Sequence, residues 1–260
     1  MSFNGKVILI TGASSGIGAD CACHLAKLGG KVALVGRNEK RLNEVAEKIK
    51  NNGSPMPLAI VADVTQDAQR IIDDTIKHFG QLDVLINNAG VLMADNIAES
   101  FNIAEFDRIW NTNLRSVAIL THLAVPHLEK TKGNIVNVSS IAGLMSFANA
   151  LAYSISKSAL DKFTKCCAID LAPKKIRVNA INPAMIRTPI FESLGLDSAR
   201  TEKLFEDSVE QYLVGRIGEV SDTSAAIEYL SSDSASFLTG LSLPVDGGAT
   251  TSGIQWDSKK

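Results

Sequence analysis

The chain has 260 residues, and its 26 lysines and arginines against 28 aspartates and glutamates give a formal net charge of −2. This balance excludes a strongly basic surface, so we predict no nucleic-acid partner. Hydrophobic residues make up 45% of the chain, yet no run of about 18 apolar residues could span a membrane. The start shows neither a signal peptide nor a myristoylation pattern, so we predict a cytoplasmic protein with no membrane span.

The four cysteines form two close pairs inside segments that we expect to be helical: Cys21, Cys23, Cys166 and Cys167. Cysteines placed in this way do not favour disulfide bonds, and no cluster of cysteine and histidine has the spacing of a metal site. We therefore expect small buried thiols in a reducing compartment and no bound metal.

Short β-branched segments alternate with longer amphipathic ones along the whole chain. The predicted strands are 7–11, 31–36, 57–62, 83–87, 134–139, 176–181 and 241–245. The predicted helices between them are 17–28, 40–51, 66–79, 103–128, 151–171 and 221–231. This order indicates parallel strands joined by right-handed crossovers, and continuously apolar strands indicate a sheet covered on both faces.

The sequence therefore predicts an α/β fold, a doubly wound parallel sheet of seven strands with helices on both faces. One domain is expected to cover residues 1–260. The longest irregular stretch is 182–220, and a loop of that length in a compact domain favours a lid over a substrate.

The first predicted strand ends in a glycine-rich loop, Thr11-Gly12-Ala13-Ser14-Ser15-Gly16-Ile17-Gly18. A loop of this spacing between a strand and a helix is typical of dinucleotide binding, although a plain glycine-rich turn is the alternative. Gly12 permits the tight turn, Gly16 lets the backbone approach a pyrophosphate, and Gly18 allows close packing of helix on strand. The helix N-terminus supplies N–H groups for the anion.

The end of the second predicted strand reads Gly36-Arg37-Asn38 and bears on cofactor choice. An NAD-selective site carries a carboxylate there to accept a hydrogen bond from the ribose 2′-hydroxyl. A guanidinium instead matches a 2′-phosphate, so the sequence favours NADP(H) over NAD(H). The alternative is that Arg37 only faces solvent and that the protein selects weakly between NADP(H) and NAD(H). A strongly NADP-selective glycine loop could carry a basic residue at position 15, and this loop has Ser15.

A tyrosine and a lysine stand four residues apart near the start of the predicted helix 151–171, in Tyr153-Ser154-Ile155-Ser156-Lys157. Residues i and i+4 share a helix face, so both side chains can reach one cleft. Ser140 follows the predicted strand 134–139, and Asn113 lies in the predicted helix 103–128.

With Asn87-Asn88-Ala89-Gly90 and Pro183-Ala184-Met185-Ile186-Arg187-Thr188, these motifs resemble the short-chain dehydrogenase/reductase family over essentially the whole chain. The resemblance implies a Rossmann-like domain with a dinucleotide-binding half over about residues 1–140 and a catalytic and lid part over about 140–250. It also implies an enzyme that interconverts a carbonyl and a secondary alcohol with NADP(H). A homotetramer, or failing that a dimer, is implied as well.

The resemblance assigns catalytic roles that the chemistry supports. Tyr153 would donate a proton to the carbonyl oxygen, and Lys157 would lower the pKa of Tyr153 and bind the nicotinamide ribose. Ser140 would hold the substrate oxygen, and Asn113 would anchor a water in a proton relay behind Lys157. Strand alternation favours Ser140 over the neighbouring Ser139.

The resemblance also places further cofactor contacts around the same cleft. Asp63 and Val64 would frame the adenine, Asn88 and Gly90 would line the cleft, and Asn87 would brace neighbouring backbone. The nicotinamide end would be met by Pro183, Ile186 and Thr188, with Ala184 replacing the usual glycine after Pro183 and tightening the wall there.

The substrate pocket is predicted from segments 91–93 and 141–147 and from six lid residues, Ile190, Phe191, Leu194, Leu196, Leu204 and Phe205. These are mainly apolar, Met93 and Met145 are flexible, and Arg187 is the only obvious anion partner. A lipophilic small molecule is therefore favoured: a steroid-like, retinoid, isoprenoid or fatty-acyl ketone.

Two other functions stay open. One is 3-oxoacyl-thioester reduction on an acyl carrier protein or coenzyme A, for which basic clusters at 130–132 and 174–175 could hold the acidic carrier. The other is a non-catalytic NADP-binding scaffold, although all four catalytic residue types are present.

Overall fold

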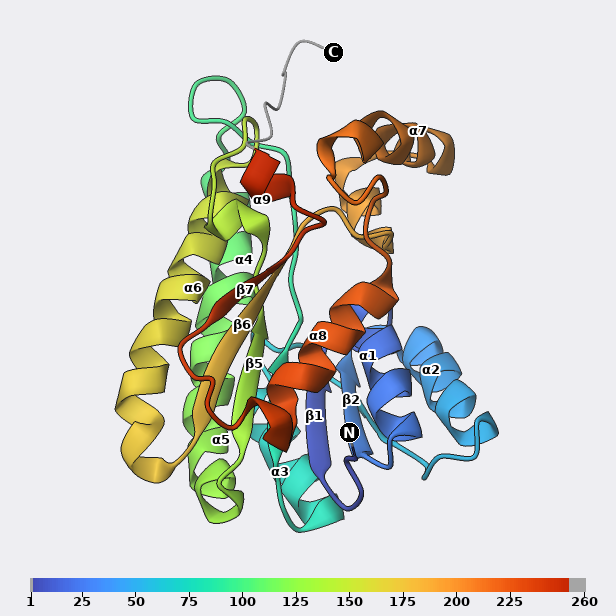
Figure 1. Cartoon of the computed structure of the whole chain (residues 1–260), viewed down its shortest axis with the longest axis vertical. Coiled ribbons are helices and arrows are strands. Elements are labelled where there is room, and N and C mark those ends of the chain that lie inside the picture. The colour runs from blue at the N-terminus through green and yellow to red at the C-terminus, as the bar shows by residue number, and fades with distance from the viewer. Residues whose placement is uncertain (1, 253–260) are drawn as a thin grey trace.

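The computed structural model describes residues 2–252, except for the side chains of 192 and 193, and is built around one sheet of seven parallel strands (Figure 1). The strands are β1 (Val7–Thr11), β2 (Lys31–Gly36), β3 (Leu58–Val61), β4 (Val84–Asn87), β5 (Asn134–Val138), β6 (Arg177–Pro183) and β7 (Ser242–Val245). Their order in the sheet is β3-β2-β1-β4-β5-β6-β7. The predicted doubly wound, parallel, seven-stranded sheet is confirmed.

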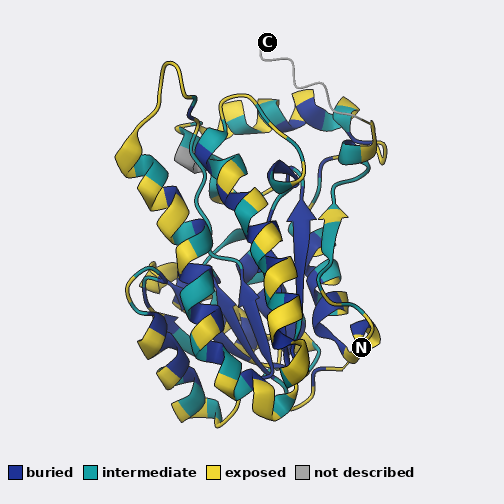
Figure 2. Ribbon diagram, turned by 90° about the vertical axis from the view of Figure 1, so that its left-hand side faces the viewer, coloured by how far each residue is buried: buried dark blue, intermediate teal, exposed yellow. Residues whose placement is uncertain are grey.

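Helices cover both faces of the sheet, as the continuously apolar strands predict. Helices α1 (Gly16–Lys27), α2 (Glu39–Asn51) and α8 (Val220–Ser231) lie on one face, and α3 (Ala68–Phe79), α5 (Ser116–Thr131) and α6 (Leu151–Leu171) on the other. Alternate residues of β1 feed the two cores, Ile8 and Ile10 on one side and Val7 and Leu9 on the other. Figure 2 shows these strands buried beneath helices whose outer faces are exposed.

The prediction of one uninterrupted helix over 103–128 is wrong in one respect. The structure divides it into α4 (Ile103–Trp110), a π-helical turn (Asn111–Arg115) and α5. The π turn widens the helix without ending it, and neither glycine nor proline stands in this segment, so the sequence does not mark the change. The π turn holds Asn113, one of the predicted catalytic residues.

The stretch predicted as irregular, 182–220, contains more structure than the sequence pattern shows. Strand β6 continues to Pro183, and the 3₁₀ turn Pro189–Leu194 and helix α7 (Ser198–Ser208) follow. Helix α7 lies over the carboxyl ends of the strands, at the upper right of Figure 1. A separate small core joins this segment to the short helix α9 (Ala249–Ser252): Met185, Phe205, Tyr212, Ile217 and Ala249.

The four cysteines are free thiols, but only Cys21 is the buried filler that we predict for all of them. Cys166 is exposed, and Cys23 and Cys167 are half-buried, because their helix faces turn partly to solvent. Within residues 2–252, no helix is long and apolar enough to cross a membrane. The same residues hold no group of three or more metal-ligating side chains arranged around a common point.

Candidate active site

The glycine loop joins β1 to α1 and needs glycine at three positions. Gly12 and Gly16 have left-handed backbone, with φ of 66° and 54°, which residues with a side chain rarely adopt. A methyl group on Gly18 would overlap the Asn88 amide and the Gly12 carbonyl. The loop can therefore present backbone, rather than side chains, to an anion at the N-terminus of α1.

Asn88 fastens this loop to the end of β4. Its Nδ2 donates to the carbonyl oxygens of Thr11 and Gly12 at 2.8 and 3.2 Å. In return, Thr11 Oγ1 accepts from the backbone N–H groups of Asn88 and Ala89, each at 3.0 Å. These bonds join the ends of β1 and β4 at the point where the strand order reverses, which is where sheets of this kind bind ligands.

The prediction that Asn87 braces neighbouring backbone is wrong. Its Nδ2 donates to the side chains of Asn137, at 2.9 Å, and Thr121, at 3.4 Å. Asn137 in turn donates to Thr164 at 2.9 Å. These partners come from a neighbouring strand and two helices, and their proximity cannot be inferred from the local sequence.

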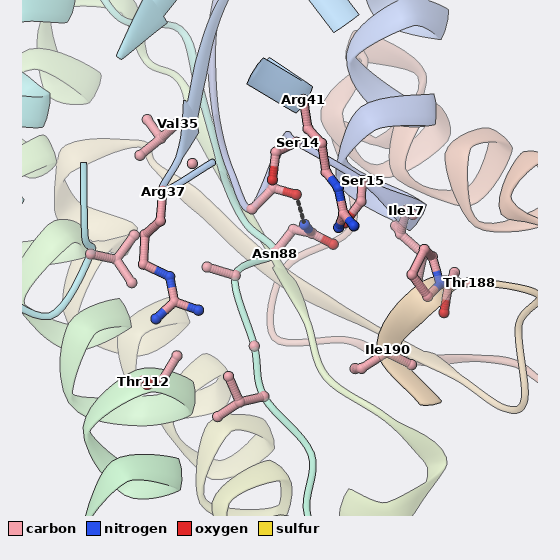
Figure 3. A pocket seen from close by; sticks show the side chains of 18 of the residues that line it. Ser14, Ser15, Ile17, Val35, Arg37, Arg41, Asn88, Thr112, Thr188 and Ile190 are labelled. Carbon is pink, nitrogen blue, oxygen red and sulfur yellow. Dashed lines mark hydrogen bonds between the residues drawn. The ribbon is translucent and has the colours of Figure 1, made fainter. Parts of the chain in front are cut away.

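A cavity of about 280 Å³ runs along the glycine loop (Figure 3). Most of the predicted cofactor residues line it: Gly12, Ser14, Ser15, Gly16, Ile17, Arg37, Asp63, Val64, Asn88, Gly90 and Thr188. Gly18 lies behind the loop, where it allows α1 to approach β1.

Arg37 and Asp63 form a pair at the ends of β2 and β3. Arg37 Nη1 lies 3.7 Å from Asp63 Oδ2, and the Arg37 side chain is 71% exposed. Burial alone would raise the pKa of Asp63, but hydrogen bonds from Thr65 and the charge of Arg37 bring it below its ordinary value. The cavity therefore has a charged wall at this end, with a cation that solvent or a ligand can reach.

Arg41 also lines this cavity and was missed by the sequence analysis. Figure 3 shows its guanidinium beside Ser14 and Ser15. Asn38 caps α2 by accepting from the backbone N–H of Arg41 at 3.0 Å, which places Arg41 in the first turn of that helix. Recognition of this cap in the sequence could have indicated a second arginine at the cleft.

Ser140 and Tyr153 meet where β5 ends and α6 begins. Ser140 Oγ accepts from the backbone N–H of Ala142 at 3.1 Å, and a side-chain hydrogen bond joins Ser140 to Tyr153. Burial raises the pKa of Tyr153, and the bond with Ser140 opposes that rise. The neighbouring Ser139 points away and donates to the Lys157 carbonyl at 3.2 Å.

Lys157 lies on the same side of α6 as Tyr153, with Nζ 5.6 Å from the centroid of the tyrosine ring. The ammonium is 4% exposed and donates to the Val138 carbonyl at 2.8 Å. Burial lowers the pKa of Lys157 to about 8, and the charge of Asp161 opposes that fall. Lowering of the Tyr153 pKa by Lys157 stays a prediction.

Asn113 occupies the π turn and ties three segments together. Its Oδ1 accepts from the Val91 N–H at 2.8 Å, and its Nδ2 donates to the Val91 carbonyl at 3.0 Å and to Ser156 Oγ at 3.1 Å. The side chain therefore fixes the loop after β4 against α6, beside Lys157.

A second cavity, of about 450 Å³, opens from this group of residues toward α7. Its polar lining includes Ser140, Tyr153 and Lys157. The lining predicted from the lid and the loops is largely present: Leu92, Met93, Ile141, Ala142, Phe147, Ile190, Phe191, Leu194, Leu196 and Leu204. Pro183 and Ile186 also line this cavity, and Thr188 lines both cavities.

Six of the predicted pocket residues do not line the second cavity: Val91, Gly143, Leu144, Met145, Ser146 and Phe205. Met145 does not contact the cavity, and Met185 lines it instead. Phe205 is buried under the lid and packs edge-on against Phe191, with ring centroids 5.4 Å apart. Val91 faces the first cavity rather than the second. The course of the loops after β4 and β5, and the packing of Phe205 on Met185 and Tyr212, decide which of these side chains face inward, and the residue pattern shows neither.

Arg187 is not an anion partner inside either cavity. Its guanidinium pairs with Glu202 and Glu219 and lies 4.8 Å from the Phe205 ring centroid. These contacts connect the segment after β6 to α7. Among the described residues, Lys157 is therefore the only cationic side chain that lines the second cavity.

Comparisons with known proteins agree with this geometry. The sequence model of a family described as Enoyl-(Acyl carrier protein) reductase matches residues 12–250. Cyclopentanol dehydrogenase of Comamonas sp. is 38% identical over 95% of this chain and 98% of its own. A short-chain dehydrogenase/reductase of Caenorhabditis elegans, solved with cofactor, superposes with a TM-score of 0.91 at 35% identity, over 96% of each chain.

A 3-ketoacyl-(acyl-carrier-protein) reductase of Brucella melitensis, solved with NADH, gives a TM-score of 0.88 at 34% identity, over 96% of this chain and all of its own. The chain thus belongs to the short-chain dehydrogenase/reductase family. It is an oxidoreductase of the class that uses a nicotinamide cofactor.

The close packing of Gly18 is testable. We expect Gly18→Ala to weaken NADPH binding at least tenfold and to lower the free energy of unfolding by about 1–3 kcal/mol, the usual cost of overpacking. NADPH fluorescence titration and a melting curve measure the two effects. Asn43→Ala, at an exposed position of α2, is the control. Wild-type binding and melting of Gly18→Ala would contradict this packing.

Proposed function

We propose that the protein is an NADP(H)-dependent oxidoreductase that interconverts lipophilic ketones and secondary alcohols. The observation that carries the proposal is the meeting of Ser140, Tyr153 and Lys157 at the wall of an apolar cavity that adjoins the glycine-loop cavity. Ile17, Asn88 and Thr188 line both cavities, so a ligand in one can reach a ligand in the other.

The residues at this junction have separate roles in the proposed reaction. When bound, the nicotinamide supplies the hydride for reduction and accepts it in oxidation. Tyr153 donates its hydroxyl proton to the carbonyl oxygen during reduction, and Ser140 holds that oxygen by a hydrogen bond. Lys157 favours the tyrosinate that is left and binds the nicotinamide ribose. Asn113 anchors the water through which the proton is replaced.

The lining of the second cavity supports a lipophilic substrate. Apolar side chains from three segments face it, while Arg187 is held outside by Glu202 and Glu219. A free acid or a phosphorylated sugar would bury its charge among apolar side chains there, with Lys157, which already donates to the Val138 carbonyl, as the only cation of the described lining. Steroid-like, retinoid, isoprenoid and fatty-acyl ketones fit this lining. The relatives are named for substrates of both kinds, cyclopentanol and a hydroxysteroid on one side and L-fucose on the other, so the proposal rests on the lining.

The alternative of 3-oxoacyl-thioester reduction is less well supported. The basic clusters at 130–132 and 174–175 lie at the C-terminal end of α5 and just after α6, beside the amino ends of the strands, whereas the glycine loop lies at the carboxyl ends. Lys174 pairs with Glu129 at 2.6 Å. An acyl carrier bound at these clusters would be at the wrong end of the sheet to deliver its acyl group to Tyr153. A scaffold without activity would not need the Ser140–Tyr153–Lys157 arrangement.

The preference for NADP(H) rests on Arg37 and Arg41, which both line the first cavity. The end of β2 offers Gly36 in place of a carboxylate, and a side chain at Gly36 would press on Ser14 at 3.1 Å. A 2′-phosphate therefore meets cations here, without a repelling carboxylate at the end of β2. We also propose that the protein is cytoplasmic.

Replacement of Tyr153 tests the catalytic role. Tyr153→Phe removes the proton donor and keeps the ring, so we expect turnover to fall about a hundredfold or more. NADPH affinity, measured by fluorescence, should hardly change. Tyr229→Phe, which alters an exposed tyrosine on α8, is the matched control. Ordinary turnover of Tyr153→Phe on a panel of apolar ketones would refute the proposed mechanism.

Replacement of Arg37 tests cofactor choice. We expect wild type to have a higher kcat/KM with NADPH than with NADH. Arg37→Ala should lower kcat/KM for NADPH about tenfold, because a charge-assisted bond to the 2′-phosphate is lost, and leave the value for NADH nearly unchanged. Arg108→Ala, on the exposed face of α4, is the control. Better use of NADH than NADPH by wild type would show that the preference is wrong.

We also propose assembly into a homotetramer or a dimer, partly through α4 and α6. Exposed apolar side chains gather there: Phe101, Ile103, Trp110 and Ile155. A second group, Tyr229 and the fully exposed Phe237, lies near the β7 edge of the sheet. Large apolar patches on soluble proteins mark interfaces, and an open sheet edge invites pairing.

Light scattering at low micromolar concentration measures this assembly. We expect a mass two or four times the 27.7 kDa of the chain, because burial of these patches favours association. The variant Ile155→Glu should lower the mass, whereas Lys27→Glu should leave it unchanged. A fully active species with the mass of one chain would refute the assembly.

A further inference from the structure

One buried carboxylate behind the active site has no part in the roles proposed above. Asp161 lies on α6 one turn beyond Lys157 and is 5% exposed. Its Oδ2 accepts from Asn182 Nδ2 at 2.8 Å, and its Oδ1 lies 3.5 Å from Ser242 Oγ. Because burying a carboxylate is costly, these polar partners are needed to keep it in place.

Asn182 links this carboxylate to Ser140. The same Nδ2 donates to the Ser140 carbonyl oxygen at 2.9 Å, and Asn182 is completely buried. Gly143, which follows Ser140, lies against the carboxylate, since a methyl group there would overlap Asp161 Oδ2. The ends of β5 and β6 and the middle of α6 therefore meet at Asp161.

Asp161 also lies on the same face of α6 as Lys157, four residues further along, and both side chains are buried. Burial lowers the pKa of Lys157 to about 8, and Asp161 opposes that fall. The groups that face Lys157 from the other elements are uncharged, the Val138 carbonyl from β5 and Gly90 from the loop after β4. Tyr153 is the other titratable neighbour, on the same helix.

The same interaction acts in reverse on the carboxylate. Burial raises the pKa of Asp161, and hydrogen bonds from Ser139 and Asn182 oppose the rise, as do the charges of Lys157 and Lys165. The two buried charges thus stabilise each other, although each would be costly alone.

We propose that Asp161 is a positioning residue of the active site, which fixes Ser140 through Asn182 and serves as the buried counter-charge of Lys157. It lines neither cavity and so acts through these two residues rather than on substrate. The proposal rests on the function proposed for Ser140, Tyr153 and Lys157.

Two variants separate the two effects. Asp161→Asn keeps the shape and the acceptor for Asn182 but removes the charge. If ketone reduction needs protonated Lys157, kcat/KM is at its full value below the pKa of that lysine. It falls as the pH rises through that pKa. Without Asp161 the pKa falls, so the alkaline limb of kcat/KM should move about one pH unit lower. Asp161→Glu should restore the limb.

Asn182→Ala keeps the charge and removes the link to Ser140. We expect kcat for ketone reduction to fall about tenfold, the scale of one lost hydrogen bond in a buried network, with KM little changed. The alkaline limb should remain at the wild-type pH. Purely structural damage would lower the melting temperature without this division between the two variants.

The control is Asp170→Asn, which removes a carboxylate from an exposed position of the same helix. If the alkaline limb of kcat/KM for Asp161→Asn coincides with those of wild type and Asp170→Asn, Asp161 is not the counter-charge of Lys157. An unchanged kcat in Asn182→Ala would overturn the link to Ser140. If Asp161→Asn does not fold, the Asn182→Ala variant alone tests the proposal. Absence of ketone reduction in wild type would instead overturn the proposed function itself.

Discussion

The reversal of strand order between β1 and β4 is the constraint on which the site depends. The two strands are neighbours in the sheet, but α1 follows β1 onto one face and α5 lies on the other. Their carboxyl ends therefore border a crevice between the two helical layers. The hydrogen bonds of Thr11 and Asn88 hold this crevice together, and the glycine loop keeps it clear of side chains. Both cavities begin there.

Burial of Lys157 follows from the same geometry. The residues at positions 153 and 157 face the crevice from α6, so an ammonium that reaches it is surrounded by β5 and the loop after β4. A buried cation needs polar partners, and the Val138 carbonyl and the Asp161 charge supply them. The apolar lining of the second cavity adds no competing charge, which leaves Lys157 as the cation next to Tyr153.

The sequence predicts those parts of the site that lie within one element or one short loop. The glycine loop and the four-residue spacing of Tyr153 and Lys157 are of this kind, and the sheet follows from regular alternation of elements. The π turn at Asn113 was missed because the chain stays helical through it and neither glycine nor proline marks it. Asp161, Asn182 and the partners of Asn87 were missed because their contacts join residues far apart in the chain, which no local pattern contains.

Hydride transfer between a nicotinamide cofactor and a carbonyl carbon can be followed with an isotope. NADPH with both hydrogens at C4 of the nicotinamide replaced by deuterium can be incubated with the protein and a panel of apolar ketones, cyclopentanone among them. The alcohols are then analysed by mass spectrometry. Hydride transfer from the cofactor to the carbonyl carbon gives a product alcohol with one deuterium on the carbinol carbon. Alcohol without deuterium, or no alcohol from any ketone of the panel, would contradict it.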